Sequence, residues 1–406
     1  MREGKEKIMK IKVAKGGICA PEGVRAYGIK EGNKGLAVIE GEGKAVGMFT
    51  SNKIKAAPVR FTKKQLDKGR IRAIVANSGC ANSFTGETGM RNAERMAELA
   101  SSFLGIARDE VAVASTGPIG VHLDMGLIER QLGDVVKGLT AAEPGSAAAA
   151  RAIMTTDTFP KEQAIRIDTS TGEHAVIGGI AKGSGMIFPH LRLATMLSFM
   201  YTDASVEEEV LKRSLKEAVD NSFNMVVVDG DMSTNDMVLL VSTGKSVQVS
   251  EEDFKAGLQV VCRELAKLIA KDGEGATKFI EVRVSGATSI RDAREVARSI
   301  LRSPLVKSAI QGERPDFMCG RIIAAIGSSA IAGNVDPPGL SIRIRSDKEV
   351  IAVKNGAFMD LLGVAREILR GKEIFIEVDI GAGEEEATAW GCDLSSEYVR
   401  INAGVH

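Results

Sequence analysis

Short apolar runs alternate with longer amphipathic stretches along the chain, and this alternation predicts a mixed α/β protein with layered sheets and helices. The short runs are rich in apolar and β-branched residues, which favours strands. We expect strands at residues 74–76, 111–114, 164–167, 196–201, 225–228, 238–241, 279–284, 322–326, 342–344 and 374–378.

Helices are marked by capping residues before an apolar stripe. Ser205 and Glu208 form a capping-box pattern, which predicts a helix from there to about residue 221. Ser250 and Ser289 are expected to begin two more helices, the second ending at Pro304. Further helices are predicted at 92–104 and 358–369.

The 406 residues are enough for two or three domains with a large core. A new strand–helix unit begins after Lys278. We therefore expect a larger α/β unit at 1–278 and a smaller C-terminal α/β domain at 279–406. No stretch offers 18 uninterrupted apolar residues, and the charged first residues carry no apolar signal core, so no membrane span or secretion signal is expected.

The balance of charges and the spacing of the cysteines exclude several functional classes of protein. The 53 basic and 53 acidic residues balance, and aromatic residues make up only 4%, which argues against nucleic-acid binding. Five widely spaced cysteines form no CxxC pair, a pattern that suits the reducing cytoplasm. The four histidines show no HExxH spacing. We therefore expect no metal site and no bound cofactor.

Polar clusters follow several of the predicted strands. Thr116 and Gly117 belong to the run 115–120, which directly follows the strand at 111–114. Exposed N–H groups there could stabilise an oxyanion; an ordinary β-turn is the alternative. Thr155 belongs to a polar cluster that could bind a ligand's amino and carboxylate groups or cap a helix. The acidic loop 229–236 fails the EF-hand pattern, so a hydrogen-bonded turn is expected there.

Two charged residues lie among glycines. Glu274 could hold a substrate ammonium, and its surroundings lack the P-loop spacing. Lys182 could bind a carboxylate, although taken alone a solvated loop lysine is the expected state. Thr195 is a hydroxyl residue in an apolar run. Either it bonds to neighbouring backbone, or it is a nucleophile released when the chain is cut just before it.

The order of the motifs is more specific than any one of them. The succession TTDTFPK, GGIAKGSGM, LATMLSF, VDGDMSTNDMVLL, DGEGATK and CDLSSEYVRIN closely resembles the ornithine acetyltransferase (glutamate N-acetyltransferase) family of arginine biosynthesis. Earlier segments, such as VANSGCANSFTGE and ASTGPIG, also fit. The resemblance extends from about residue 17 to 402. It implies a layered α-β-β-α sandwich of the self-cleaving ornithine acetyltransferase and aminopeptidase type, with the smaller C-terminal domain completing the substrate site.

The resemblance implies self-cleavage between Ala194 and Thr195 into an α chain, 1–194, and a β chain, 195–406. Thr195 would then carry a free α-amine, whose unperturbed pKa of about 7.7–8.0 suits a built-in base. The implied reaction is ping-pong. The Thr195 hydroxyl takes acetyl from N2-acetyl-L-ornithine, and L-glutamate then receives it as N-acetyl-L-glutamate.

Site residues also follow from the resemblance. Thr116 and Gly117 correspond to the oxyanion hole. Substrate contacts correspond to Thr155, Lys182, Thr195, Glu274 and Asn402. From charge, we pair Lys182 with the substrate α-carboxylate and Glu274 with the distal ammonium of ornithine. Two departures from the family pattern occur: the segment before Thr195 is two residues longer, and the chain stops one residue before the family's final hydroxyl contact.

Alternatives remain at this point. A self-cleaving amidase or aminopeptidase would use the same N-terminal nucleophile, with water as the acceptor. An uncleaved protein that binds amino acids would use none of this chemistry. The resemblance further implies small-molecule substrates, an α2β2 heterotetramer, a cytoplasmic location and no nucleic-acid or membrane partner. It leaves acetyl-CoA open as a second acetyl donor, which would make the enzyme multifunctional.

Overall fold

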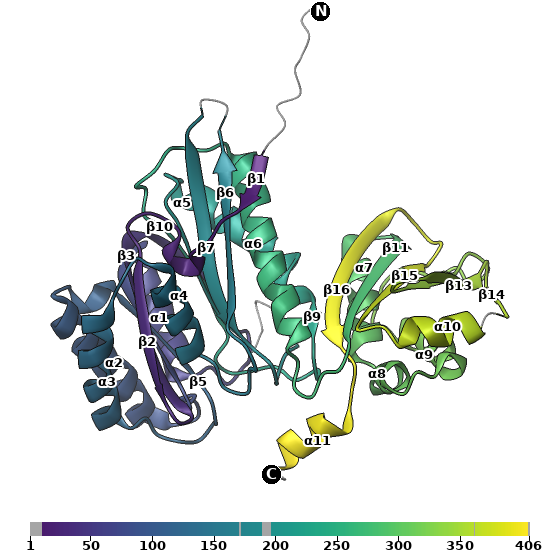
Figure 1. Cartoon of the computed structure of the whole chain (residues 1–406), viewed down its shortest axis with the longest axis horizontal. Helices are drawn as coiled ribbons and strands as arrows, with labels where there is room; N and C mark the ends of the chain where they lie inside the picture. The colour runs from purple at the N-terminus through teal and green to yellow at the C-terminus, as the bar shows by residue number, and fades with distance from the viewer. Residues whose placement is uncertain (1–9, 170–171, 189–195, 361, 405–406) are drawn as a thin grey trace, which may run out of the picture. The chain divides into compact units, whose positions relative to one another are not determined.

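The computed structural model describes residues 10–169, 172–188, 196–360 and 362–404, and its ribbon is shown in Figure 1. The chain divides into two compact units. The first unit consists of Met1–Gly183, His190–Phe223 and Met232–Leu265, and the second of Ser184–Pro189, Asn224–Asp231 and Ala266–His406. One division between the units lies within α6 (Glu251–Lys271), between Leu265 and Ala266. The boundary expected after Lys278 therefore falls inside the second unit.

The first unit is built on a nine-stranded sheet in the order β1-β6-β7-β8-β10-β3-β4-β5, with β2 also paired to β3. A register shift between Glu40 and Gly43 interrupts the pairing of β3 with β4. The strands are β1 (Lys10–Val13), β2 (Arg25–Glu31), β3 (Lys34–Phe49), β4 (Arg70–Ser78), β5 (Val111–Thr116), β6 (Lys161–Asp168), β7 (His174–Lys182), β8 (Leu197–Thr202) and β10 (Met237–Ser242).

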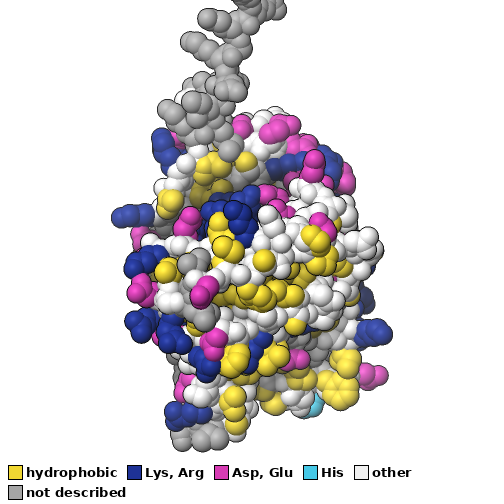
Figure 2. Space-filling view, turned by 90° about the vertical axis from the view of Figure 1, so that its right-hand side faces the viewer, with side chains coloured by type: hydrophobic (Ala, Val, Ile, Leu, Met, Phe, Trp, Pro, Cys, Tyr) yellow, Lys and Arg dark blue, Asp and Glu magenta, His cyan; other side chains and the backbone are white. Residues whose placement is uncertain are grey.

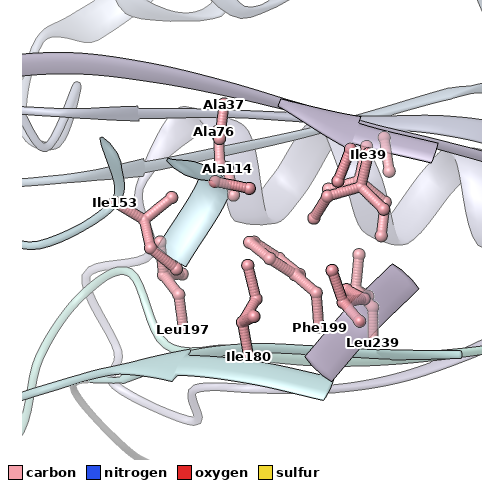
Figure 3. Packing of buried hydrophobic residues seen from close by; sticks show 14 of the residues in the cluster. Ala37, Ile39, Ala76, Ala114, Ile153, Ile180, Leu197, Phe199 and Leu239 are labelled. Atoms are coloured by element: carbon pink, nitrogen blue, oxygen red, sulfur yellow. The ribbon is translucent and has the colours of Figure 1, made fainter. Parts of the chain in front are cut away.

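The two halves of this sheet face each other across a buried core. Figure 3 shows Ala37 and Ala76 of β3 and β4 on one side and Ile180 and Leu239 of β7 and β10 on the other. Phe199 of β8 is fully buried between them. Because successive side chains of a strand point to opposite faces, the long β3 supplies alternate residues to this inner core and to an outer one.

Helices cover the outer faces of the two halves. Apolar residues of α1, α2 and α3 pack on β3, β4 and β5, and α6 packs on β6 to β8 through contacts such as Cys262 with Met200. The resulting α-β-β-α sandwich is the fold class expected from the sequence. The helices are α1 (Ala57–Leu66), α2 (Gly86–Leu104), α3 (Met125–Gly138), α4 (Glu143–Ala152), α5 (Glu208–Asp220) and α6 (Glu251–Lys271).

The second unit has a seven-stranded sheet in the order β14-β13-β12-β15-β11-β16-β9. Helix α7 packs on β11 and β16. The strands are β9 (Val226–Val227), β11 (Phe279–Ala287), β12 (Ser341–Arg345), β13 (Glu349–Lys354), β14 (Ala357–Phe358), β15 (Glu373–Asp379) and β16 (Glu385–Cys392). The helices are α7 (Ile290–Arg302), α8 (Pro304–Gln311), α9 (Pro315–Gly327), α10 (Leu362–Leu369) and α11 (Ser396–Ala403).

Three local predictions were wrong. Residues 322–326 belong to α9 and not to a strand, because a short apolar run carries no period that separates a strand from a buried helix. Ser205 does not cap α5, whose first residue is Glu208 and whose N-cap position is Glu207. Phe358 lies in β14, four residues before α10 begins.

No helix among the described residues is long and apolar enough to cross a membrane. On the face of the molecule shown in Figure 2, Lys and Arg side chains are interspersed with Asp and Glu side chains. This mixture agrees with the balanced composition of the chain.

Candidate functional site

Lys182 is the last residue of β7, and its side chain is buried in the first unit with 3% of its surface exposed. Its Nζ donates hydrogen bonds to the hydroxyl of Thr155 at 2.8 Å and to the hydroxyl of Thr116 at 3.2 Å. The solvated loop lysine considered from the sequence is therefore wrong. The fold places an ammonium group beside two hydroxyl groups in a protected position.

Asp157 lies next to this ammonium group and forms an ion pair with it. Its carboxylate is 3.8 Å from Lys182 Nζ and 2.7 Å from the buried Nζ of Lys161. It also accepts the backbone N–H groups of Thr155 and Gly183. Burial by itself would raise the pKa of Asp157, but the charges of the two lysines and these hydrogen bonds hold it well below its usual range.

The loop of Thr155 and Asp157 connects α4 to β6, so it does not cap the start of a helix. The helix cap considered from the sequence is wrong here. The two N–H groups that bond to Asp157 belong to Thr155 in the loop and to Gly183, which follows β7, and neither begins a helix. The carboxylate instead fixes the position of Thr155, whose hydroxyl contacts Lys182.

Thr116 ends β5, and Gly117 follows it in a conformation with φ of +138°. A Cβ at Gly117 would overlap the backbone of Gly79 and Cys80, so only glycine fits without a shift of the chain. Cys80 N–H donates to the Thr116 carbonyl at 3.0 Å, and Ala81 N–H donates to the carbonyl of Pro118 at 3.1 Å. This backbone pairing holds the loop in place.

Asn235 ties the same region together from another loop. Its side-chain amide donates to the carbonyls of Ala81 at 2.6 Å and Ser115 at 2.8 Å, and it is buried. Sequence reasoning did not single out this residue, although it lies inside the VDGDMSTND motif that was used. A buried amide just before an apolar strand is a weak signal, because many such residues only satisfy backbone groups.

Ala194 and Thr195, the predicted cleavage site, lie outside the described residues. The residues that follow, from Met196 on, are part of the described chain. Met196 is buried, and its carbonyl accepts the N–H of Met237 at 3.0 Å. Leu197 pairs with Lys182 in the antiparallel ladder of β7 and β8. The residue two positions after Thr195 is therefore the direct cross-strand neighbour of the buried lysine.

Glu274 and Asn402 come together in the second unit. The Asn402 amide donates to the Glu274 carboxylate at 2.8 Å and to the Tyr398 carbonyl at 3.0 Å. Glu274 is 9% exposed, and in the described part of the chain no Lys or Arg forms an ion pair with it. A nearly buried carboxylate without a cation is costly, which makes it a suitable partner for a cationic ligand.

The structure thus groups the predicted site residues into two sets. The first set lies in the first unit and consists of Thr116, Gly117, Thr155 and Lys182. The second set lies in the second unit and consists of Glu274 and Asn402. Sequence reasoning missed Lys161 as the ion-pair partner of Asp157. The i, i+4 spacing of this pair in TTDTFPK was the available signal, but outside a helix that spacing predicts no contact.

Known proteins with similar sequences identify the family of this chain. Residues 22–405 match the model of the ArgJ family. A Methanosarcina mazei protein named glutamate N-acetyltransferase is 50% identical over 97% of this chain and 99% of its own length. A Symbiobacterium thermophilum protein named arginine biosynthesis bifunctional protein ArgJ is 45% identical over 95% of this chain and 98% of its own.

Among solved structures, the arginine biosynthesis bifunctional protein argJ of Bacillus halodurans is 40% identical, with a TM-score of 0.48, over 52% of this chain and all of that one. The family match and the two long alignments confirm the family that the ordered motifs predicted. This chain belongs to the ArgJ family.

Proposed function

We propose that the chain is a glutamate N-acetyltransferase that moves acetyl from N2-acetyl-L-ornithine to L-glutamate through an acetyl ester on Thr195. The observation that carries this proposal is the environment of Lys182. Its buried ammonium group donates to two hydroxyl groups, and its backbone is the cross-strand neighbour of Leu197. Family membership and the names of the long relatives support the reaction. The enzyme class expected from the motifs agrees with those names.

In the first half-reaction, the Thr195 hydroxyl attacks the acetyl carbonyl carbon and passes its proton to the free α-amine of the same residue. The tetrahedral oxyanion is stabilised by the Thr116 hydroxyl and the Gly117 N–H. The proton then goes to the departing nitrogen as the carbon–nitrogen bond breaks, and ornithine leaves. Removing one oxyanion donor typically costs about 2.7–4 kcal/mol of transition-state stabilisation.

In the second half-reaction, the amine of L-glutamate attacks the acetyl ester and restores the Thr195 hydroxyl. Lys182 and Thr155 are proposed to bind a substrate carboxylate, because an ammonium beside a hydroxyl offers two donors to carboxylate oxygens. Glu274 and Asn402 are proposed to take the distal ammonium of ornithine, because Glu274 is nearly buried and has no cationic partner among the described residues.

Intact-mass measurement of the purified protein tests the proposal. Two chains that correspond to residues 1–194 and 195–406 are expected, and Thr195→Ala should leave one chain of 43.0 kDa. Ser198→Ala is a suitable control, because this buried hydroxyl three residues later bonds to the Ile180 carbonyl and to no other described residue, and its loss should leave cleavage intact. A wild-type protein that stays at full mass would contradict self-cleavage.

Activity assays then separate the possible acceptors of the acetyl group. We expect ornithine release from N2-acetylornithine to depend on L-glutamate and to yield N-acetylglutamate in equal amount. Release that is equally fast without glutamate would identify an amidase instead. The same assay with acetyl-CoA in place of acetylornithine decides whether this chain also uses acetyl-CoA as a donor.

A further inference from the structure

The turn Ser184–Ile187 belongs to the second unit and is tied to it from several sides. The Ser184 carbonyl accepts the N–H of Glu274 at 3.1 Å, and its hydroxyl donates to the Asp272 carbonyl at 2.6 Å. The Ile187 carbonyl accepts the N–H of Val228 at 2.7 Å. These bonds fix both ends of the turn.

The middle of the turn is held by one side chain. The carboxylate of Asp229 accepts the N–H of Met186 at 2.6 Å and the N–H of Ile187 at 2.9 Å. Met186 has φ of +57°, a left-handed conformation that is unfavourable for a residue with a side chain. Such a conformation persists where the surroundings over-determine it, and Asp229 supplies two charge-assisted bonds at that point.

The turn brings Gly185 against the predicted ammonium-binding carboxylate. A Cβ at Gly185 would overlap the carboxyl group of Glu274, so the glycine backbone forms one wall around that group. Asn402 contacts the same carboxyl group from α11. The position of Glu274 therefore depends on where the turn lies, and Asp229 holds the Met186–Ile187 side of the turn while Ser184 holds its start.

We propose that Asp229 is a positioning residue, which holds the Gly185–Ile187 turn against Glu274 and thereby sets affinity for the cationic substrate. This inference rests on the proposed function. Small displacements of positioning groups cost activity steeply.

The first test measures how well the amide hydrogens of the turn are protected from exchange, independently of catalysis. In the uncleavable Thr195→Ala protein, amide hydrogen exchange of a peptide that covers residues 184–188 should be slow. Adding Asp229→Ala should speed exchange of the Met186 and Ile187 amides by roughly 10- to 100-fold, because their acceptor is lost. A peptide from β11 that keeps its protection shows that the second unit remains folded. Unchanged exchange at the turn would overturn the proposal.

The second test measures substrate affinity and catalysis. Asp229→Ala should raise KM for N2-acetylornithine by roughly 10- to 100-fold, with a smaller change in kcat. Asp229→Asn, which keeps a carbonyl acceptor, should recover part of the lost affinity. Asp231→Asn is the matched control, since this exposed acid lies in the same loop and only its backbone N–H bonds to Asp229.

A double-mutant cycle separates positioning from general destabilisation. In a Glu274→Gln background, Asp229→Ala should raise KM little further, because the group that it positions has already lost its charge. Fully additive effects, or an Asp229→Ala enzyme that binds N2-acetylornithine as wild type does, would refute the inference. Failure of the proposed function looks different, since wild-type protein itself would then neither cleave nor transfer acetyl.

Discussion

Burial gives a single lysine or aspartate its chemical role in this protein. Lys182 and Lys161 are both almost completely buried, and Asp157 contacts the two ammonium groups. A buried charge is tolerated only when it is paired and hydrogen-bonded, so each member of this cluster depends on the others. The sequence shows three charged residues in two separate motifs, and their mutual contact exists only in the folded chain.

Replacing Asp157 by Asn should be strongly destabilising, by about 3–5 kcal/mol at pH 7, because it leaves buried lysines without their carboxylate. Since folding lowers the pKa of Asp157, its stabilising contribution is complete above the unfolded-state pKa of about 3.9 and is lost as the pH falls further. Urea unfolding of wild type should therefore show a stability loss below about pH 4 that Asp157→Asn lacks.

Asp134→Asn provides the control for this measurement. Asp134 forms an exposed pair with Lys137 on α3, and its loss should change the unfolding free energy by less than about 1 kcal/mol. If Asp157→Asn cost no more than Asp134→Asn at pH 7, the buried cluster would not have the importance that its geometry indicates.

At the scale of the element, similar sequence signals gave different helix starts. Ser289 caps α7, and its hydroxyl accepts the N–H of Asp292 at 3.1 Å, as the pattern predicted. Ser205 carries an equally good capping pattern, but α5 begins at Glu208 and its N-cap position is Glu207. The backbone N–H of Ser205 donates to the Val247 carbonyl instead, so a tertiary contact overrides the local preference.

Two alanine substitutions compare these serines. Ser289→Ala should cost about 1 kcal/mol of unfolding free energy, because an orphan N–H at the start of α7 loses its acceptor. Ser205→Ala should cost less than about 0.5 kcal/mol, as is usual for an exposed side chain without such a role. Urea unfolding followed by circular dichroism measures both, and equal costs would mean that Ser205 caps α5 after all.

At the scale of the whole molecule, the order of strands in the first sheet explains why a cut before Thr195 need not separate the chain. The order β7-β8-β10-β3 places β8 and β10, which follow residue 195, between β7 and β3, which precede it. Both borders are full ladders, with β8 antiparallel to β7 and β10 antiparallel to β3. Separation of the two fragments would expose the core between them.

The cleaved protein should therefore elute from a size-exclusion column as one species that contains both chains. Denaturant should be needed to separate them, because two strand ladders and the buried core must break. Elution of separate fragments in native buffer would contradict this interleaved arrangement. Light scattering on the same column also measures the native mass, which tests the α2β2 assembly that stays a prediction.

The sequence by itself determined the family, the α/β class and most strand positions, because ordered motifs and hydrophobic periodicity are local properties that survive without coordinates. It also named Thr116, Gly117, Thr155, Lys182, Glu274 and Asn402 as site residues. Their roles at the site stay predictions.

Only the tertiary structure decided which of these residues touch and which charges are buried. It buried Lys182 beside Thr155 and Asp157, paired Lys182 with Leu197, and set Gly185 against Glu274. The physical reason is that burial, ion pairing and cross-strand contact depend on residues far apart in sequence. No local pattern contains that information, as the helix at 322–326 and the unused cap at Ser205 also show.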